Sequence, residues 1–154
     1  MKNNHLTAAL MDRLTSSTLC CCTWAFTSKG AGRLRLTGVP QGAWNYAAHQ
    51  LRMPVLPGSK YRLSCWLKID QLEPGVAPYL KIGLTDGDGR WLENRHTGRY
   101  DLSSPGTWQR LEGTFETPLE TAGGHLALER GGNDVQTQIS AWIDDVQLEL
   151  LEAP

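Results

Sequence analysis

Hydrophobic and polar residues alternate most regularly in residues 57–70, which begin with a Pro57-Gly58 turn. The apolar side chains occupy every second position, at Tyr61, Leu63, Cys65, Leu67 and Ile69. The positions between them are polar, with the exception of Trp66. A period of two over this length predicts a β-strand with one buried face and one outward face. We therefore expect Trp66 to point outward.

Shorter segments with strand character follow one another along the chain, separated by turns rich in Gly and Pro. They span residues 19–26, 33–37, 44–55, 79–85, 90–95, 107–117, 125–130 and 138–151. Within residues 79–85 we expect Leu80, Ile82 and Leu84 to face inward, and residues 86–89 form a tight hairpin turn. Even spacing of short strands, without a long helical pattern, predicts an all-β protein with an antiparallel β-sandwich.

The length of 154 residues corresponds to one domain. We expect residues 1–18, which place three leucines at helical spacing, to be an N-terminal extension or linker, and residues 19–154 to form the sandwich. Asp12 and Arg13 interrupt any apolar region of a secretory signal. No segment is long enough to span a membrane. We expect this chain to have the same cellular location as a larger parent protein of which it is a part. That location is extracellular if the parent is secreted.

Charge and cysteine content narrow the classes of partner and of metal site. The formal net charge is −1, which gives no electrostatic reason to expect nucleic acid or a membrane surface as partner. Cys20, Cys21 and Cys22 are consecutive, so their side chains point to opposite faces of a strand. This spacing fits neither a disulfide framework nor zinc ligand pairs. We expect these residues to be reduced and to fill a strand.

Patterns of catalytic residues are absent from the sequence. It contains no Gly-x-Ser-x-Gly nucleophile motif, and its four histidines are scattered. Asp86, Asp88 and Glu93 superficially resemble a calcium loop, but Arg90 and Trp91 stand where an oxygen ligand and the required glycine belong. We therefore expect no enzymatic activity, although the chain is suited to be an accessory domain of a glycoside hydrolase or lyase.

Three segments, in this order, resemble the carbohydrate-binding modules of the cellulose- and xylan-binding jelly-roll group (families four, nine and twenty-two), which share the galactose-binding-like fold. The segments are residues 56–68 (LPGSKYRLSCWLK), 106–115 (GTWQRLEGTF) and 142–148 (WIDDVQL). The resemblance covers about residues 20–151. It implies a jelly-roll sandwich that binds a polysaccharide or oligosaccharide without catalysis, linked to other domains in a larger protein.

The resemblance also assigns candidate binding residues. Trp44 matches the position of a stacking tryptophan in the xylan-binding members, and Glu129 matches a hydroxyl-binding acid. Ala127 departs from the pattern, because those members carry an aromatic residue there. Flat rings stack on the apolar faces of sugars, while carboxylates bond their hydroxyl groups. Further outward or loop candidates are Tyr46, Trp66, Tyr79 and Trp91. We expect Trp108 and Trp142 to pack in the core.

The Asp144-Asp145 pair is the candidate metal site. Strict alternation along residues 142–150 places Asp144 on the same face as Val146 and Leu148, at the interior or its rim. The resemblance implies a structural calcium ion at this position, with further ligands from the first strand. Residues 16–26 contain no Asp or Glu, however. The alternative is an aspartate capped by backbone N–H groups.

Two other functions fit the same fold. The first is a structural or adhesive β-sandwich of a phage tail or cell-surface assembly, without a sugar site. The second is a hydrolase or lyase, which needs two facing carboxylates in a deep cleft. The exposure of the outward aromatic residues distinguishes a structural protein from a carbohydrate-binding module. In a structural protein, a partner subunit or loops would cover these rings.

Overall fold

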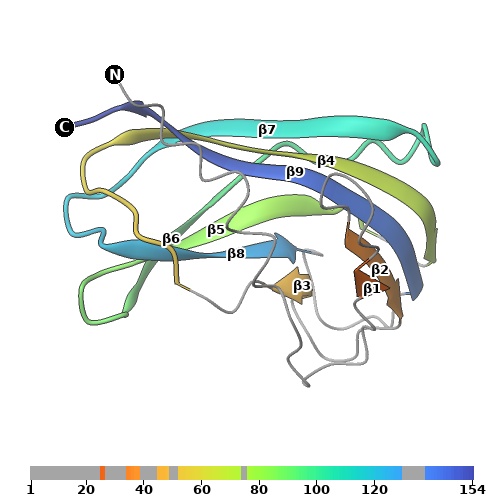
Figure 1. Cartoon of the computed structure of the whole chain (residues 1–154), viewed down its shortest axis with the longest axis horizontal. Coiled ribbons are helices and arrows are strands. Elements are labelled where there is room, and N and C mark those ends of the chain that lie inside the picture. The colour runs from red at the N-terminus through yellow and green to blue at the C-terminus, as the bar shows by residue number, and fades with distance from the viewer. Residues whose placement is uncertain (1–24, 27–33, 39–44, 49–51, 74–75, 130–137) are drawn as a thin grey trace.

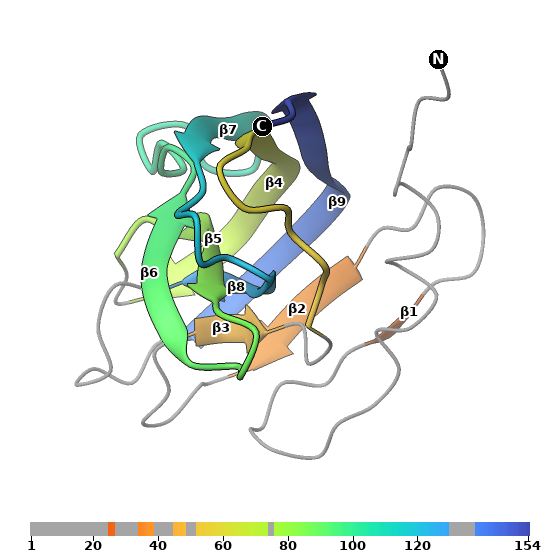
Figure 2. The ribbon, with the colours of Figure 1, turned by 90° about the vertical axis from the view of Figure 1, so that its left-hand side faces the viewer.

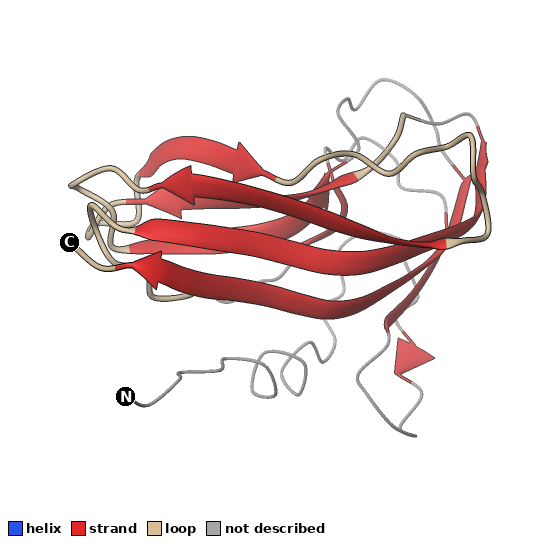
Figure 3. Cartoon of the chain, turned by 90° about the horizontal axis from the view of Figure 1, so that it is seen from above, coloured by secondary structure: helices blue, strands red, loops and turns tan. Residues whose placement is uncertain are grey.

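The computed structural model describes residues 25–26, 34–38, 45–48, 52–73, 76–129 and 138–154. In these ranges all regular elements are β-strands, and they form two antiparallel sheets that face each other (Figures 1 and 2). Figure 3 shows the same layers from above, with no helix among the described residues. The predicted all-β antiparallel sandwich is confirmed.

The five-stranded sheet has the order β1-β2-β9-β4-β7. Its strands are β1 (Ala25–Phe26), β2 (Leu34–Gly38), β9 (Gln138–Glu152), β4 (Lys60–Glu73) and β7 (Trp108–Glu116). The four-stranded sheet has the order β3-β8-β5-β6. Its strands are β3 (Asn45–Ala48), β8 (Gly123–Glu129), β5 (Tyr79–Thr85) and β6 (Trp91–His96). Among the described residues, no helix is long and apolar enough to cross a membrane.

Alternation creates the core between the two sheets. The five apolar positions predicted to face inward on β4, from Tyr61 to Ile69, are all buried. Leu80, Ile82 and Leu84 of β5 face them from the other sheet and are also buried, as predicted. The burial of these side chains is the main driving force for the association of the two layers.

The sequence predicts one strand over residues 44–55, but the strand in the structure does not continue to residue 55. Strand β3 ends at Ala48, and Met53 forms an isolated bridge with Gly124 of β8. Pro54 lacks a backbone N–H group and therefore cannot continue the ladder. The chain then passes through the predicted Pro57-Gly58 turn, where Gly58 has a φ of 55°.

The hairpin between β5 and β6 turns at Asp86, as the sequence predicts. The Asp86 carboxylate accepts hydrogen bonds from the backbone N–H groups of Asp88 (3.0 Å) and Arg90 (2.9 Å). The bond from Arg90 is the main reason why the pKa of Asp86 is lowered. This turn fixes the register in which Trp91 returns beside Thr85.

Candidate functional site

The outward side chains of the four-stranded sheet gather several of the predicted binding residues on one surface. We call this surface the β5–β8 face and define it by the outward residues of β5, β6 and β8 together with the side chains that contact them. Its members are Asn45, Arg52, Tyr79, Lys81, Thr85, Trp91, Asn94, His96, Arg99, His125 and Glu129. Tyr79, Trp91 and Glu129 therefore lie on the same side of the molecule.

Glu129 is the most buried charged residue of this face, with an exposure of 4%. Asn45 on β3 and Tyr79 on β5 lie directly opposite it on the two neighbouring strands. Its carboxylate forms an ion pair with the ammonium group of Lys81. A carboxylate withdrawn from water needs such a partner, and the pair holds Glu129 in a defined position. Sequence reasoning identified Glu129 but not Lys81, because the cross-strand pairing is not visible in the sequence.

Asn45 adds an unused hydrogen-bonding group beside Glu129. Its side-chain carbonyl oxygen is buried and has no hydrogen-bond partner among the described residues. Buried polar atoms are nearly always hydrogen-bonded, so an orphaned one in this position points to a ligand or water. The amide and the carboxylate together offer the groups that bind sugar hydroxyls.

Tyr79 lies between an arginine and a histidine at the Glu129 end of the face. The Arg99 guanidinium lies 4.4 Å from the centre of its ring, and the His96 ring is tilted against it at 5.1 Å. Burial raises the pKa of Tyr79, and the charge of Glu129 raises it further, although Arg99 opposes both. The phenol therefore stays protonated well into the alkaline range and can both donate and accept a hydrogen bond.

Trp91 lies at the far end of the face, on the edge strand β6, and 64% of it is exposed. Its indole N–H donates to Asn94 Oδ1 at 3.1 Å, which fixes the ring. Beside it Gly83 presents no side chain, and a Cβ atom there would lie 3.3 Å from Asn94 Oδ1. Trp91 is thus an outward aromatic ring, as predicted, above a bare stretch of β5.

The structure does not place two other predicted aromatic residues on this face. Trp44 falls outside the described residues. Tyr46 is only 2% exposed and belongs to the hydrophobic core, so the prediction that it faces outward is wrong. Asn45 lies opposite Glu129, and Tyr46, the next residue along the strand, points to the core; the register of β3 then shifts between Asn45 and Ala47.

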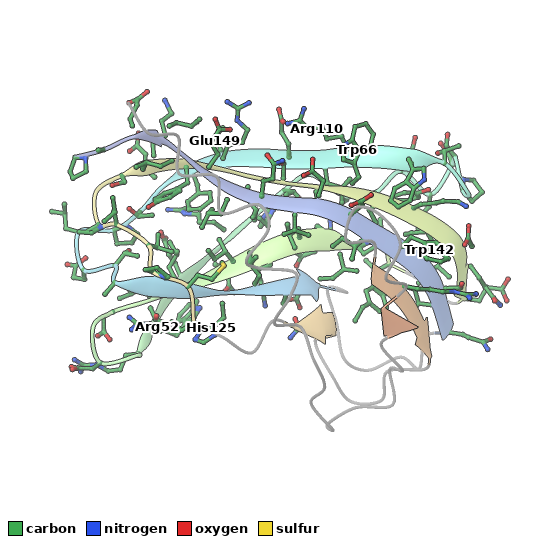
Figure 4. The ribbon with its side chains drawn as sticks, viewed as in Figure 1. Arg52, Trp66, Arg110, His125, Trp142 and Glu149 are labelled. Atoms are coloured by element: carbon green, nitrogen blue, oxygen red, sulfur yellow. The ribbon has the colours of Figure 1, made fainter. Side chains whose placement is uncertain are left out.

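Trp66 faces outward, as predicted, but from the five-stranded sheet on the opposite side of the molecule from His125 and Arg52 (Figure 4). Its exposure is 40%. Trp108 and Trp142 both pair with Lys68 and share its outward face, so the prediction that they pack in the core is wrong. Trp142 donates from its indole N–H to Asp70 Oδ2 at 3.0 Å.

A β-bulge in β9 changes the expected orientation of the acidic pair. Trp66 pairs with Asp144 and Ser64 pairs with Gln147, so β9 contains an extra residue between them. Asp145 at this bulge has a positive φ of 50°. Asp144 therefore shares the outward face of Trp66, and the prediction that it shares the face of Val146 and Leu148, at the interior or its rim, is wrong. Its Oδ1 accepts a hydrogen bond from the Asp145 N–H at 2.8 Å, as in the capped alternative.

Within the described ranges, no third His, Cys, Asp or Glu joins this acidic pair. Asp145 Oδ1 accepts a hydrogen bond from the Gln147 amide at 2.7 Å. No group of three or more His, Cys, Asp or Glu residues gathers anywhere in those ranges, whereas calcium takes six to eight oxygen ligands. Structural calcium at Asp144 and Asp145 stays a prediction.

A cavity of about 520 Å³ lies between the edge strands β6 and β7, and Glu129 is not among the residues that line it. Its lining residues are Lys60, Asn94, Arg95, His96, Thr114, Phe115 and Glu116. The aromatic candidates do not line it, so we place the candidate site on the β5–β8 face and not in this cavity.

The chain matches a known protein family and is similar to two nucleases of Bacillus subtilis. A family described as "Carbohydrate binding domain" (CBM_4_9) matches residues 21–136. The tRNA(Glu)-specific nuclease WapA of Bacillus subtilis subsp. natto is 30% identical over 96 residues, which cover 60% of this chain. The tRNA nuclease WapA of Bacillus subtilis strain 168 is 27% identical over 107 residues, or 68% of this chain. The chain spans 4% of the length of each of these relatives.

Solved structures with the same fold include xylan-binding domains. The CBM22-1 domain of Paenibacillus barcinonensis Xyn10C superimposes with a TM-score of 0.59 at 18% identity, over 87% of this chain and 84% of that one. The CBM22-1-GH10 modules of the Clostridium thermocellum xylanase Xyn10B, complexed with xylohexaose, give a TM-score of 0.60 at 13% identity. That match covers 86% of this chain and 25% of the other. At these identities the comparison concerns the fold, and it confirms the jelly-roll resemblance.

Proposed function

Since the chain belongs to the carbohydrate binding domain family, we propose that it binds a polysaccharide on the β5–β8 face. The observation that carries this proposal is the buried, oriented carboxylate of Glu129. It lies opposite Asn45 and Tyr79 and is held by Lys81. A carboxylate and an amide side by side suit the adjacent hydroxyl groups of a pyranose ring.

Aromatic rings supply the second part of the proposed interaction. Trp91 exposes its indole at one end of the face, and Tyr79 lies beside Glu129 at the other. These two residues are six positions apart across the β5–β6 pairing, where Thr85 pairs with Trp91. At about 3.3 Å per residue the face therefore extends over about 20 Å, which is long enough for several sugar units. We propose that sugar rings stack on Trp91 and on Trp44.

We propose a role in binding and not in catalysis. Glycoside hydrolysis uses two carboxylates on opposite sides of the scissile bond. Of the acidic residues that the structure describes, Glu129 is the one on the β5–β8 face, and Lys81 pairs with it. This arrangement is suited to hold a sugar hydroxyl and supplies no second acid.

We propose that the chain works as one module of a longer protein, extracellular where that parent is secreted. Its match to only 4% of the length of WapA supports a modular arrangement. The xylanase relative also joins its CBM22-1 module to a GH10 module in one chain.

The test is binding to soluble xylan, β-glucan and their oligosaccharides, measured by affinity gel electrophoresis and isothermal titration calorimetry. We expect Glu129→Gln to weaken binding at least about tenfold, because a hydrogen bond to a charged group contributes about 1.5–3 kcal/mol. Trp44→Ala should lose binding through the missing stacking platform.

Trp66→Ala is the matched control, since it removes an exposed indole from the opposite sheet. It should bind as the wild type does. The proposal fails if the wild type binds none of these glycans. Equal losses in Trp66→Ala and Trp44→Ala would also contradict it. Circular dichroism of each variant separates lost binding from lost folding.

A further inference from the structure

The β5–β8 face carries more positive charge than the rest of the described surface. Arg52, Lys81 and Arg99 lie on it, and Glu129 is its acidic residue within the described ranges. Three cations against one carboxylate leave an excess of two positive charges. The whole chain, in contrast, has a formal net charge of −1.

The opposite face of the sandwich lacks this excess. Four of its described cations have an acidic partner: Lys68 with Asp70 at 3.0 Å, Arg110 with Glu112 at 3.2 Å, Arg62 with Glu149 at 3.6 Å, and Lys60 with Glu152 at 3.3 Å. Arg35 stacks on Trp142 at 5.3 Å on the same face. The positive excess is thus a property of the proposed ligand face alone, not of the protein surface in general.

Among the cations of this face, Arg52 is the best suited to bind a ligand, because its guanidinium is held in place by uncharged acceptors. Its Nε donates to Thr85 Oγ1 at 3.0 Å, and its Nη2 donates to the carbonyl oxygen of Asp86. Both acceptors are uncharged, so they fix the guanidinium without neutralising it. Gly123 beneath it leaves the necessary space, because a Cβ atom there would collide with the Arg52 side chain. Figure 4 shows Arg52 beside His125, which is also exposed.

The other two cations have different roles. The charge of Lys81 is matched by Glu129, and only 19% of its side chain is exposed. Arg99 donates from Nη1 to the Ala77 carbonyl oxygen at 2.9 Å and covers the ring of Tyr79. Arg52 therefore lies at the Trp91 end of the face and Arg99 at the Tyr79 end, with the Lys81–Glu129 pair between the two arginines.

We propose that the ligand of the β5–β8 face is an acidic polysaccharide with uronate carboxylates along its chain, and that Arg52 binds one of these carboxylates. This inference rests on the proposed function of the same face. The planar fork of a guanidinium matches a carboxylate and gives charge-assisted hydrogen bonds. Trp91, beside Thr85 and Arg52, would receive the ring of the charged sugar or of its neighbour.

A nucleic acid is the other polyanion that a positive face can attract. Such binding requires a cation for each neutralised phosphate, and an excess of two charges supplies few of them. Glu129, at the Tyr79 end of the face, would also repel a phosphate backbone. The described geometry therefore favours a sugar chain with occasional charges.

The test compares one polymer in two states: glucuronoxylan, and the same preparation after chemical reduction of its carboxylates to alcohols. We expect the wild type to bind the carboxylated form more tightly. This preference should shrink when ionic strength rises from about 0.05 M to about 0.5 M, because salt screens exposed charges. Arg52→Gln should weaken binding of the carboxylated form about fivefold and weaken binding of the reduced form less.

Arg110→Gln is the matched control, because it removes an exposed arginine from the opposite sheet, and it should bind both forms like the wild type. Gly123→Ala keeps the charge but displaces the Arg52 side chain, so it should lower the same preference. Equal wild-type binding to the two forms, or equal losses for both in Arg52→Gln, would overturn the inference. Tighter binding of a single-stranded RNA oligomer than of glucuronoxylan would do the same.

Measuring binding to neutral xylan tests the acidic-ligand inference and the proposed sugar-binding function separately. Binding to it without any preference for the carboxylated polymer refutes the acidic ligand and leaves the sugar-binding face intact. Failure to bind any of the glycans refutes both.

Discussion

Cys65 shows how an inward position on a strand determines the chemistry of a side chain. It lies on the buried side of β4, and 1% of it is exposed. Burial raises the pKa of its thiol from 9.0 to about 12, since the charged thiolate cannot be solvated there. The thiolate is the reactive form of cysteine. Cys65 is therefore a space-filling residue at neutral pH and no candidate nucleophile.

We predict that iodoacetamide leaves Cys65 unmodified in the folded protein at pH 8 and modifies it fully in denaturant. A pKa of about 12 leaves about one thiol in ten thousand ionised at this pH. Peptide-resolved mass spectrometry measures the modification. Rapid modification of Cys65 under native conditions, in a sample with unchanged circular dichroism, would contradict the assigned burial.

The orientation of single residues is predictable where alternation is unbroken. Trp66 points outward and Leu63 inward, as the sequence predicts. Tyr46 and Asp144 are exceptions: each lies at a bulge, and the bulge in β9 reverses the face on which Asp144 lies. Such a bulge leaves no clear signal in the sequence. Asp145 adopts the positive φ at the second bulge, although a glycine would be the usual indicator.

Strand β7 contains a glycine that is required because another part of the backbone lies very close to it. Gly113 pairs with Leu63 on β4, and the backbone of His96 and Thr97 at the end of β6 lies against it. A Cβ atom at Gly113 would lie 3.1 Å from Thr97 Cα and still closer to the His96 carbonyl oxygen. Both contacts are with backbone, which cannot yield as a side chain can. The close approach of the two sheets at this edge therefore depends on a missing side chain.

We predict that Gly113→Ala destabilises the protein by about 1–3 kcal/mol, the usual cost of an overpacked site. Gly87→Ala is the matched control, because a Cβ atom in that turn would meet nothing within 4 Å. Urea unfolding monitored by circular dichroism gives both free energies of unfolding. A Gly113→Ala variant as stable as Gly87→Ala would show that the strands can separate at little cost.

For the whole molecule, the sequence predicts the sandwich but not the distribution of candidate residues between its two sides. Trp66 and Glu129 are both outward residues, yet their strands belong to different sheets. Strand order is set by long-range pairings, such as β4 with β9 and β5 with β8, which a linear pattern does not contain. Lys81 and Arg52 were missed as site residues for the same reason.

We predict that a protein consisting of residues 19–154 unfolds in one cooperative transition, with a free energy of unfolding within about 0.5 kcal/mol of the full chain. The family match over residues 21–136 supports this boundary. Chemical denaturation of both proteins is the measurement. A loss of several kcal/mol in the shorter protein would place part of residues 1–18 in the folded domain.

The three indoles on the five-stranded sheet affect how ligand binding can be observed by fluorescence. Trp66, Trp108 and Trp142 emit from the side of the sandwich opposite Glu129, so a bound ligand would leave their signal unchanged. Trp91 emits from the proposed ligand side. Total emission therefore contains a constant background. Replacing Trp66 with phenylalanine should raise the fractional signal change in a titration without altering the affinity.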